Sequence, residues 1–161
     1  MTRRKAIAIG VGGATAVGVG VAVYQSPWLR PLGANADVRV GVIGLRNKGA
    51  EHVKDIGAIR GARITAICDV DQDMIDREVG ILAGKNQKVE TYRDLRTMLE
   101  KADIDAVVIA TPNHWHALAA LWAMEAGKDV YLEKPVSHTF HEGERLVAAV
   151  KKTGRIVQSG T

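Results

Sequence analysis

The stretch from Asp105 to Pro135 constrains the fold of this chain more than any other segment. It reads as a short apolar, β-branched run, a polar loop, an apolar helical segment and a second apolar run that ends in Glu-Lys-Pro. A continuous apolar run of this kind is typical of a central parallel strand that is covered on both faces. In an open parallel α/β sheet, ligands bind beyond the carboxyl ends of the strands. The polar segments TPNHWH and EKP therefore lie where such a fold places its chemistry.

The chain after Ala36 repeats this alternation of strand and helix. Short apolar runs predict the strands, and apolar periodicity that ends at a glycine predicts the helices. Repeated β-α-β units with short loops predict an α/β fold with a doubly wound parallel (Rossmann) sheet and helices on both faces. The predicted strands are Val38–Ile43, Arg63–Cys68, Lys88–Glu90, Asp105–Ala110, Asp129–Leu132 and Arg155–Gln158. The predicted helices are Lys48–Ile59, Asp71–Ala83, a segment opened by Thr91–Asp94, His114–Ala126, and one from a capping box at Thr139 to about Lys152.

The formal charge of +4 comes entirely from the amino-terminal segment. Residues 1–36 contain basic residues and no acidic one, and basic and acidic residues are equal in number from Asp37 onward. A body without net charge has no excess of cations for a phosphate backbone, so we expect no nucleic acid partner. The single cysteine, Cys68, lies in an apolar strand and is predicted to be a buried, inert thiol.

Residues 1–36 are typical of a targeting segment that precedes the folded domain. The twin arginines Arg3 and Arg4 precede the uncharged run Ala6–Val23, and Ala34-Asn35-Ala36 matches a small-residue cleavage pattern. The run is long enough for a membrane span, but its frequent glycines lower its hydrophobicity. We predict a twin-arginine-type signal peptide that exports the protein to the periplasm or the medium. An uncleaved leader that anchors the protein in the membrane and a basic start without a signal are the alternatives.

A loop typical of dinucleotide binding follows the first predicted strand. Its candidate cofactor-binding residues are Gly44, Leu45, Arg46, Asn47, Lys48 and Gly49. Glycines at such a turn let the backbone approach a pyrophosphate, and the following helix N-terminus supplies N–H groups and a partial positive charge. The second glycine of the usual fingerprint is replaced by Arg46, which either obstructs this approach or points outward toward a phosphate. An ordinary tight turn is the alternative.

Asp69 closes the second strand, near the spacing of about 20 residues at which the fingerprint expects an acid. A carboxylate in this place accepts hydrogen bonds from the hydroxyls of the adenosine ribose. Together with Asp71 and Asp73 it would repel a ribose 2′-phosphate. We therefore predict NAD as the cofactor, and Arg46 leaves NADP open. A helix-capping role for Asp69 is the alternative.

The segment TPNHWHALAALWAMEAGKDVYLEKP resembles the glucose–fructose oxidoreductase / inositol dehydrogenase / MocA (Gfo/Idh/MocA) family of NAD(P)-dependent proteins, as do VGVIG, CDVD and GRIVQSGT. The resemblance runs from about Val38 to Thr161, and the HWH variant resembles secreted members with twin-arginine leaders. Family members continue with a second domain that carries most of the substrate pocket. We therefore expect residues 37–161 to be the NAD(P)-binding domain of a longer enzyme whose carboxyl-terminal substrate domain is absent here, with an oligomer left open.

The resemblance implies further cofactor-binding residues beside the fourth and fifth strands. They are Thr111, Pro112, Asn113, His116, Glu133 and Lys134. In the family the lysine also touches the reacting hydroxyl of the substrate, so Lys134 is the candidate catalytic residue. An ammonium group there stabilises negative charge that develops on oxygen during hydride transfer. A cis bond before Pro135 would set the direction of Lys134, because X–Pro is the common place for such a bond. An ordinary surface turn is the alternative.

The histidines do not make a metal site by their spacing. His114-x-His116, with His138 and His141, lacks the cysteine or clustered acid that would complete a set of ligands, so we predict no metal. We expect His52 and His138 to be solvated or to lie at helix ends.

Three functions fit these residues. The first is the amino-terminal half of an exported oxidoreductase that transfers hydride between NAD(P) and a sugar or polyol. The second is an NAD-dependent glycosidase of the lyase type that recycles its cofactor. The third is a truncated module that binds NAD without catalysis, because one domain lacks half of a substrate cleft. Enzyme activity of this chain by itself is therefore open, and contact with a membrane is expected only through an uncleaved leader.

Overall fold

The structure, a computed structural model, describes residues 37–160. The predicted signal peptide, its cleavage pattern and the twin arginines lie outside the described residues. Among residues 37–160, no helix is both long enough and apolar enough to cross a membrane.

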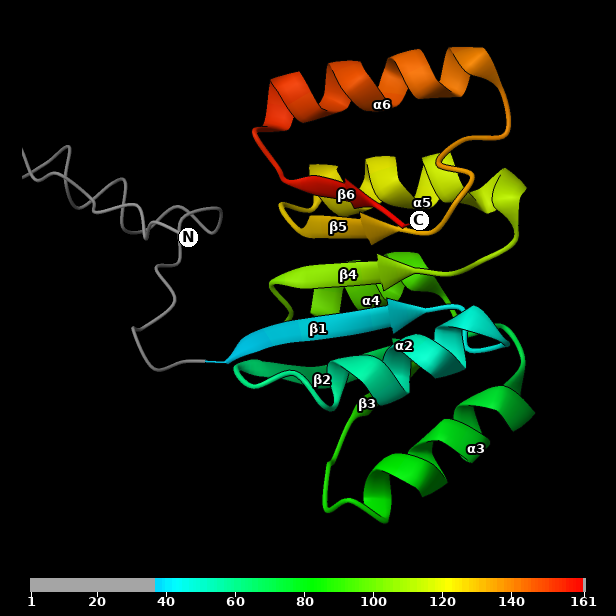
Figure 1. Ribbon diagram of the computed structural model, residues 1–161, viewed down its shortest axis with the longest axis vertical. Coiled ribbons are helices and arrows are strands. Elements are labelled where there is room, and N and C mark those ends of the chain that lie inside the picture. The colour runs from blue at the N-terminus through cyan, green and yellow to red at the C-terminus, as the bar shows by residue number, and fades with distance from the viewer. Residues whose placement is uncertain (1–36, 161) are drawn as a thin grey trace, which may run out of the picture. The chain divides into compact units, whose positions relative to one another are not determined.

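The described residues form one six-stranded parallel sheet in the order β3-β2-β1-β4-β5-β6 (Figure 1). The strands are β1 (Val38–Ile43), β2 (Ala62–Cys68), β3 (Glu90–Tyr92), β4 (Ala106–Ile109), β5 (Asp129–Leu132) and β6 (Val157–Ser159). The helices are α2 (Lys48–Ile56), α3 (Gln72–Ala83), α4 (Leu95–Lys101), α5 (Asn113–Glu125) and α6 (Phe140–Thr153). The predicted doubly wound α/β fold is confirmed.

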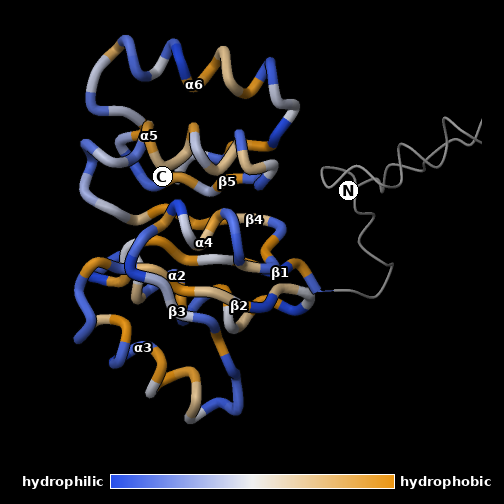
Figure 2. Tube along the Cα trace, turned by 180° about the vertical axis from the view of Figure 1, so that it is seen from behind, coloured by the Kyte–Doolittle hydropathy of each residue, from blue (hydrophilic) through white to orange (hydrophobic). Residues whose placement is uncertain are grey.

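Each face of the sheet has its own apolar core. On one face, residues of α2 and α3 such as Val53 and Ile75 pack against β1 and β2. On the other face, residues of α4, α5 and α6 pack against β1, β4 and β5. Figure 2 shows hydrophobic colour along the central strands, whereas α3 and α6 alternate between hydrophobic and hydrophilic. The central strands are apolar on both sides because helices cover both sides.

The strand register brings four chain segments to one edge of the sheet. Ile43 at the end of β1 is level with Cys68 of β2 and with Ile109 of β4, and Ile109 is level with Leu132 of β5. The residues after these strand ends therefore emerge side by side. The chain order reverses between β1 and β4, and in doubly wound sheets a ligand-binding crevice lies at this point.

Three elements differ from the prediction by two or more residues at an end, and one of them is β6, which begins at Val157 rather than Arg155. The helix predicted to reach Ile59 ends at Ile56, because the chain must turn there to place Gly61, whose carbonyl oxygen accepts the Val38 N–H at 2.8 Å. The third strand is Glu90–Tyr92 rather than Lys88–Glu90, because it pairs with the last residues of β2. The corrections to α2 and β3 follow from pairing with β1 and β2. Such pairing joins residues that are distant in the chain, so a local sequence pattern does not reveal it.

The predicted buried thiol is confirmed. Cys68 is 3% exposed, and burial, with the nearby charges of Asp69 and Asp94, raises the pKa of its thiol to about 12. A thiol with so high a pKa carries little thiolate at neutral pH and is a poor nucleophile.

Candidate functional site

The loop between β1 and α2 requires glycine at two positions. Gly44 has a φ of +85°, and a Cβ there would lie 2.7 Å from the carbonyl oxygen of Ala110. A Cβ on Gly49 would lie 1.8 Å from the carbonyl oxygen of Gly44. No side chain fits at such distances, so the two glycines let the start of α2 pack against the loop. The N-terminus of α2, a favourable place for an anion, consequently lies at the carboxyl edge of the sheet.

The Asp69 carboxylate ties the loop after β1 to the loop after β2. Its Oδ2 accepts the N–H of Leu45 at 2.7 Å, and its Oδ1 accepts the N–H of Asp71 at 3.0 Å. A carboxylate has about four acceptor positions, so each oxygen can still accept a further hydrogen bond. Asp69 is therefore a rigidly held acceptor that faces the same edge as the glycine loop.

The Arg46 side chain is exposed and reaches the loop after β2. Its side chain is 67% exposed, and its Nη2 donates to the Asp71 carboxylate. Hydrogen bonds from Arg46 and from the Asp73 N–H hold the pKa of Asp71 below its ordinary value. The structure thus shows Arg46 exposed and paired with the Asp71 carboxylate.

The loop after β4 is held by a buried histidine. His116, at 1% exposure, lies in the first turn of α5 with Nε2 2.7 Å from the Thr111 carbonyl oxygen. Its Nδ1 lies 2.6 Å from the carbonyl oxygen of Pro135. The ring thus joins the loop after β4 to the turn after β5. The buried hydroxyl Oγ1 of Thr111 has no hydrogen-bond partner among residues 37–160.

The turn after β5 carries the candidate catalytic lysine. The Lys134–Pro135 peptide bond is cis, as the sequence suggested. The Glu133 N–H donates to the Ile109 carbonyl oxygen at 3.0 Å, which extends the pairing of β5 with β4 by one residue. Glu133 is 7% exposed, whereas Lys134 is exposed.

These segments enclose a pocket of about 580 Å³ at the switch point of the sheet. Its lining residues are Gly44, Arg46, Asn47, Lys48, Asp69, Val70, Asp71, Ala110, Thr111, Pro112, Asn113, His116, Glu133 and Lys134. Two candidates from the sequence, Leu45 and Gly49, are not among them. The Leu45 side chain is fully buried in the core beside α2, and Gly49 packs against Gly44. Both residues therefore support the loop from its core side rather than lining the pocket.

His52 was expected from the sequence to be solvated or to lie at a helix end, but it lies within α2 and is largely buried. Its side chain is only 16% exposed, and Nε2 lies 2.8 Å from Oε1 of Glu133. Its ring also packs edge-on against Tyr131, with centroids 5.2 Å apart. The sequence did indicate that His52 is buried, because His52 lies on the same helical face as the buried residues Gly49 and Ile56. A polar residue on a buried face needs a polar partner.

The carboxyl group of Glu133 has a lowered pKa in this pair. Burial raises the pKa of its carboxyl group, but hydrogen bonds from His52 and from the Lys134 N–H outweigh burial. Attraction to His52 and Lys48 adds to their effect, and the pKa falls below its ordinary value. The pocket therefore has a buried carboxylate on its β5 side.

A metal centre is not formed by the described residues. Among residues 37–160, no three His, Cys, Asp or Glu side chains lie close enough together to hold a metal ion. The polar side chains that line the pocket include the carboxylates of Asp69 and Glu133 and the ammonium of Lys134, groups that suit a dinucleotide.

Comparison with known proteins assigns the class. A family profile described as "Oxidoreductase family, NAD-binding Rossmann fold" matches residues 38–161. The chain belongs to this family, the Gfo/Idh/MocA oxidoreductases, as the sequence motifs indicated.

Among curated relatives, a "Glycosyl hydrolase family 109 protein" of Shewanella sp. (strain W3-18-1) is 39% identical over 124 residues. That alignment covers 72% of this chain and 26% of the relative. A second protein of this description, from Shewanella sp. (strain MR-4), is 40% identical over 121 residues, with the same coverage. The chain thus spans about a quarter of the length of the curated relatives that it matches.

Solved structures of inositol dehydrogenases share the fold. Apo scyllo-inositol dehydrogenase from Lactobacillus casei matches with a TM-score of 0.73 and 27% identity, over 78% of this chain and 37% of that protein. The same enzyme with bound NAD(H) and scyllo-inositol matches with a TM-score of 0.72 and 28% identity, over 77% of this chain and 36% of that protein. Binding of NAD(H) is therefore a property of the family to which the chain belongs.

Proposed function

We propose that this chain binds NAD(H) in the pocket at the carboxyl edge of the sheet and forms the cofactor side of an oxidoreductase that acts on a sugar or polyol. The observation that carries the proposal is the convergence of the Gly44–Gly49 loop, Asp69 and Lys134 on this one pocket. Solved relatives that bind NAD(H) with an inositol support the kind of substrate.

The residues of the pocket fit the cofactor. The glycine loop and the N-terminus of α2 suit the pyrophosphate. Asp69 can accept hydrogen bonds from the ribose hydroxyls while it holds the N–H groups of Leu45 and Asp71. Among residues 37–160 the buried Thr111 hydroxyl has no hydrogen-bond partner, and a bound ligand would supply one.

The acidic residues at the end of β2 favour NAD over NADP. A 2′-phosphate would meet the carboxylates of Asp69 and Asp71, and like charges at such short range repel. Arg46 does not offset this repulsion fully, because its guanidinium already pairs with Asp71.

In this proposal Lys134 stabilises the charge that develops on the reacting oxygen during hydride transfer. The bound nicotinamide would accept or donate the hydride. The Lys134 ammonium, at the rim of the same pocket, would hydrogen-bond the oxygen of the reacting alcohol or carbonyl group and stabilise its negative charge.

The Asp69→Asn variant tests the cofactor site. We expect its NAD dissociation constant to rise about tenfold, the effect of losing a charged hydrogen-bond acceptor, while its affinity for NADP stays equal or improves. Calorimetric titration of residues 37–161 with both cofactors measures this change. The matched control is Asp76→Asn, the same substitution on the exposed surface of α3. Equal NAD affinity in Asp69→Asn and wild type would contradict the proposed site.

A second candidate is glycoside cleavage in which NAD is recycled through a transient keto sugar. The observation that favours it is the identity of 39–40% to proteins described as glycosyl hydrolases of family 109, against 27–28% for the inositol dehydrogenases. Cleavage of aryl glycosides by the NAD-loaded protein without net formation of NADH would support this reading. NADH formation from a free sugar or polyol would support the dehydrogenase.

A third candidate is binding without catalysis by the chain alone. The residues that line the pocket are candidates for cofactor binding, and the chain spans about a quarter of the length of its curated relatives, so we expect residues 37–161 to bind NAD(H) without dehydrogenase turnover. Robust turnover on any sugar by this chain would exclude this reading.

We further propose that the protein is exported by a twin-arginine leader. The support is the pair Arg3-Arg4 before the uncharged run Ala6–Val23. This route carries folded proteins, so that a tightly held cofactor could be loaded before export. A leader that stays uncleaved as an anchor is the alternative.

A further inference from the structure

Glu133 and Lys134 are neighbours in the sequence with opposite charges, yet their side chains do not pair with each other. The buried Glu133 carboxylate binds His52 Nε2 through Oε1, at 2.8 Å. Its Oε2 accepts the backbone N–H of Lys134 at 3.1 Å. The Lys134 side chain is exposed at the rim of the pocket, and its ammonium makes no ion pair with any of residues 37–160.

This arrangement is not the one that charge alone favours. A poorly solvated carboxylate gains most from a cation that can contact it, and a flexible lysine next in the chain is the nearest candidate. An ammonium held in such a pair would be less available to a ligand. If the Lys134 ammonium is to stay available, another group must therefore hydrogen-bond the Glu133 carboxylate.

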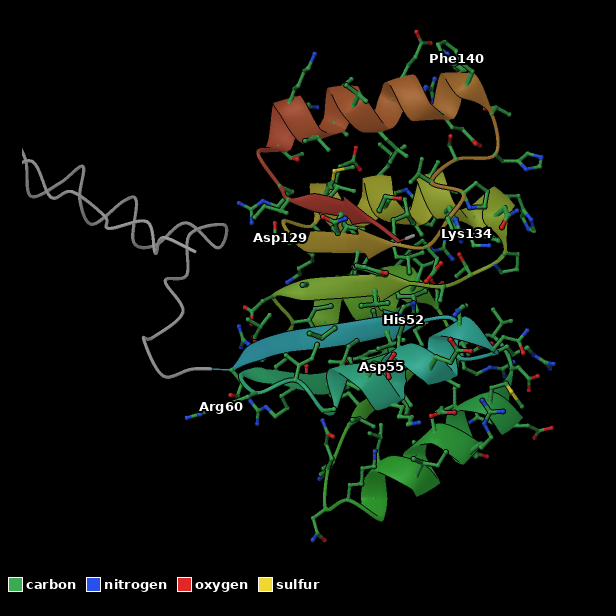
Figure 3. The ribbon with its side chains drawn as sticks, in the orientation of Figure 1. His52, Asp55, Arg60, Asp129, Lys134 and Phe140 are labelled. Carbon is green, nitrogen blue, oxygen red and sulfur yellow. The ribbon has the colours of Figure 1, made fainter. Side chains whose placement is uncertain are left out.

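His52 is such a group, because its place on α2 and its contact with Tyr131 hold its ring in position. It lies on the buried face of α2, with its ring edge-on against Tyr131. On the other side, a Cβ added to Gly160 would lie 3.2 Å from Oε2 of Glu133, so the carboxylate is closely packed there as well. Figure 3 shows His52 on α2 and Lys134 after β5, toward the end of the sheet at which the strands point.

We propose that His52 is a positioning residue: it holds the Glu133 carboxylate away from the Lys134 ammonium and so keeps this cation available to ligands in the pocket. The inference deepens the proposed function and rests on it for the nature of the ligand. The interaction itself, between residues 81 positions apart in the chain, is a property of the protein without any ligand.

The test measures how fast Lys134 is acetylated in the cofactor-free protein. An ammonium in an ion pair reacts more slowly, so we expect His52→Leu to slow acetylation of Lys134 about fivefold, the factor that a partly exposed ion pair is worth. The rate is read by mass spectrometry and divided by the rate of Lys151, an exposed lysine on α6. The double variant His52→Leu/Glu133→Gln should recover the wild-type rate, because no carboxylate is left to capture the lysine.

Three further variants separate positioning from general loosening. His52→Gln keeps an N–H donor near the position of Nε2 and should acetylate like wild type. His141→Leu, the same change as His52→Leu at an exposed histidine of α6, should also have no effect. Glu133→Gln alone should leave the rate unchanged, because Glu133 is not bound to the ammonium in the wild-type protein. Circular dichroism confirms that each variant is folded.

An unchanged or faster Lys134 rate in folded His52→Leu would overturn the proposal, since loosening alone exposes the amine. If His52→Leu does not fold, a faster rate in Glu133→Gln than in wild type overturns it, because the pair would then already exist. Acetylation needs no cofactor, so its result is independent of the NAD titration. A slowed Lys134 with no NAD binding would retain the positioning role and reject the proposed function.

Discussion

At the scale of single residues, Asp105 shows how a polar group is held at the amino edge of the sheet, away from the pocket. Its Oδ2 accepts the backbone N–H and the Nε–H of Arg39, both at 2.9 Å, and its Oδ1 lies 2.6 Å from Nη2. The hydrogen bond from the Arg39 side chain outweighs partial burial and lowers the pKa of Asp105. The fork of Arg39 thus joins β1 to the start of β4.

This pair predicts part of the acid sensitivity of the domain. A carboxyl group whose pKa is lower in the folded than in the unfolded state stabilises the fold above its unfolded pKa of about 3.9. That stabilisation is lost as the pH falls through the folded pKa. We expect Asp105→Asn to lower the free energy of unfolding by about 1.5–3 kcal/mol at pH 7. The difference from wild type should shrink as the pH falls through the lowered pKa of Asp105 in the folded protein.

Urea unfolding at pH 7 and at pH 3 measures this effect. Asp76→Asn on the exposed surface of α3 is the control for loss of one negative charge. A difference between Asp105→Asn and wild type that grows as the pH falls would show that the sign is wrong.

At the scale of elements, the contact of α2 with the loop before it depends on the absence of a side chain. A Cβ on Gly49 would lie 1.8 Å from the Gly44 carbonyl oxygen, and that oxygen belongs to the backbone and has little room to move. We expect Gly49→Ala to cost at least about 2 kcal/mol of unfolding free energy and to abolish cofactor binding. Chemical unfolding and the NAD titration measure the two losses.

The same substitution elsewhere should act in the opposite direction. Gly80 lies inside α3, and apart from the neighbouring backbone of its own helix no atom of the described residues comes within 4 Å of a Cβ placed there. Gly80→Ala should stabilise the protein by about 0.5–1 kcal/mol, because alanine loses less entropy in a helix than glycine. If Gly49→Ala and Gly80→Ala had similar effects, the close approach at Gly49 would not be the cause.

Helix ends whose signals are local were predictable from the sequence. The capping box opens α6 as expected, with the Thr139 hydroxyl accepting the Glu142 N–H and the Glu142 carboxylate accepting the Thr139 N–H. Gly154 ends this helix in the left-handed conformation. The end of α2 and the position of β3 were wrong by a few residues, because pairing with other strands decided them.

At the scale of the whole molecule, the leader is expected to decide where the protein is found. Replacing both Arg3 and Arg4 by lysine keeps the charge and removes the twin arginines. We expect this double variant to stay in the cytoplasm, while Arg30→Lys is exported like wild type. Cell fractionation with an antibody to the folded domain measures the distribution. Export of the double variant at the wild-type level would reject the twin-arginine route.

The candidate pocket was only partly predictable. Its glycine loop, Asp69 and the TPNHWH and EKP segments follow directly from the sequence, because parallel strands end at a common edge. The pairing of His52 was missed, because its partner Glu133 lies 81 residues further along the chain. No local pattern identifies such a partner.

The sequence by itself determined the order of strands and helices, the helix caps and the two glycines that shape the loop. Each of these depends on residues a few positions apart, and backbone preferences act over that range. Only the tertiary structure decided the sheet order, the pairing of Arg46 with Asp71 and the hydrogen bond of Glu133 with His52. These features depend on which distant groups become neighbours when the two apolar cores pack, because burial then leaves each polar group only the partners that the fold brings within reach.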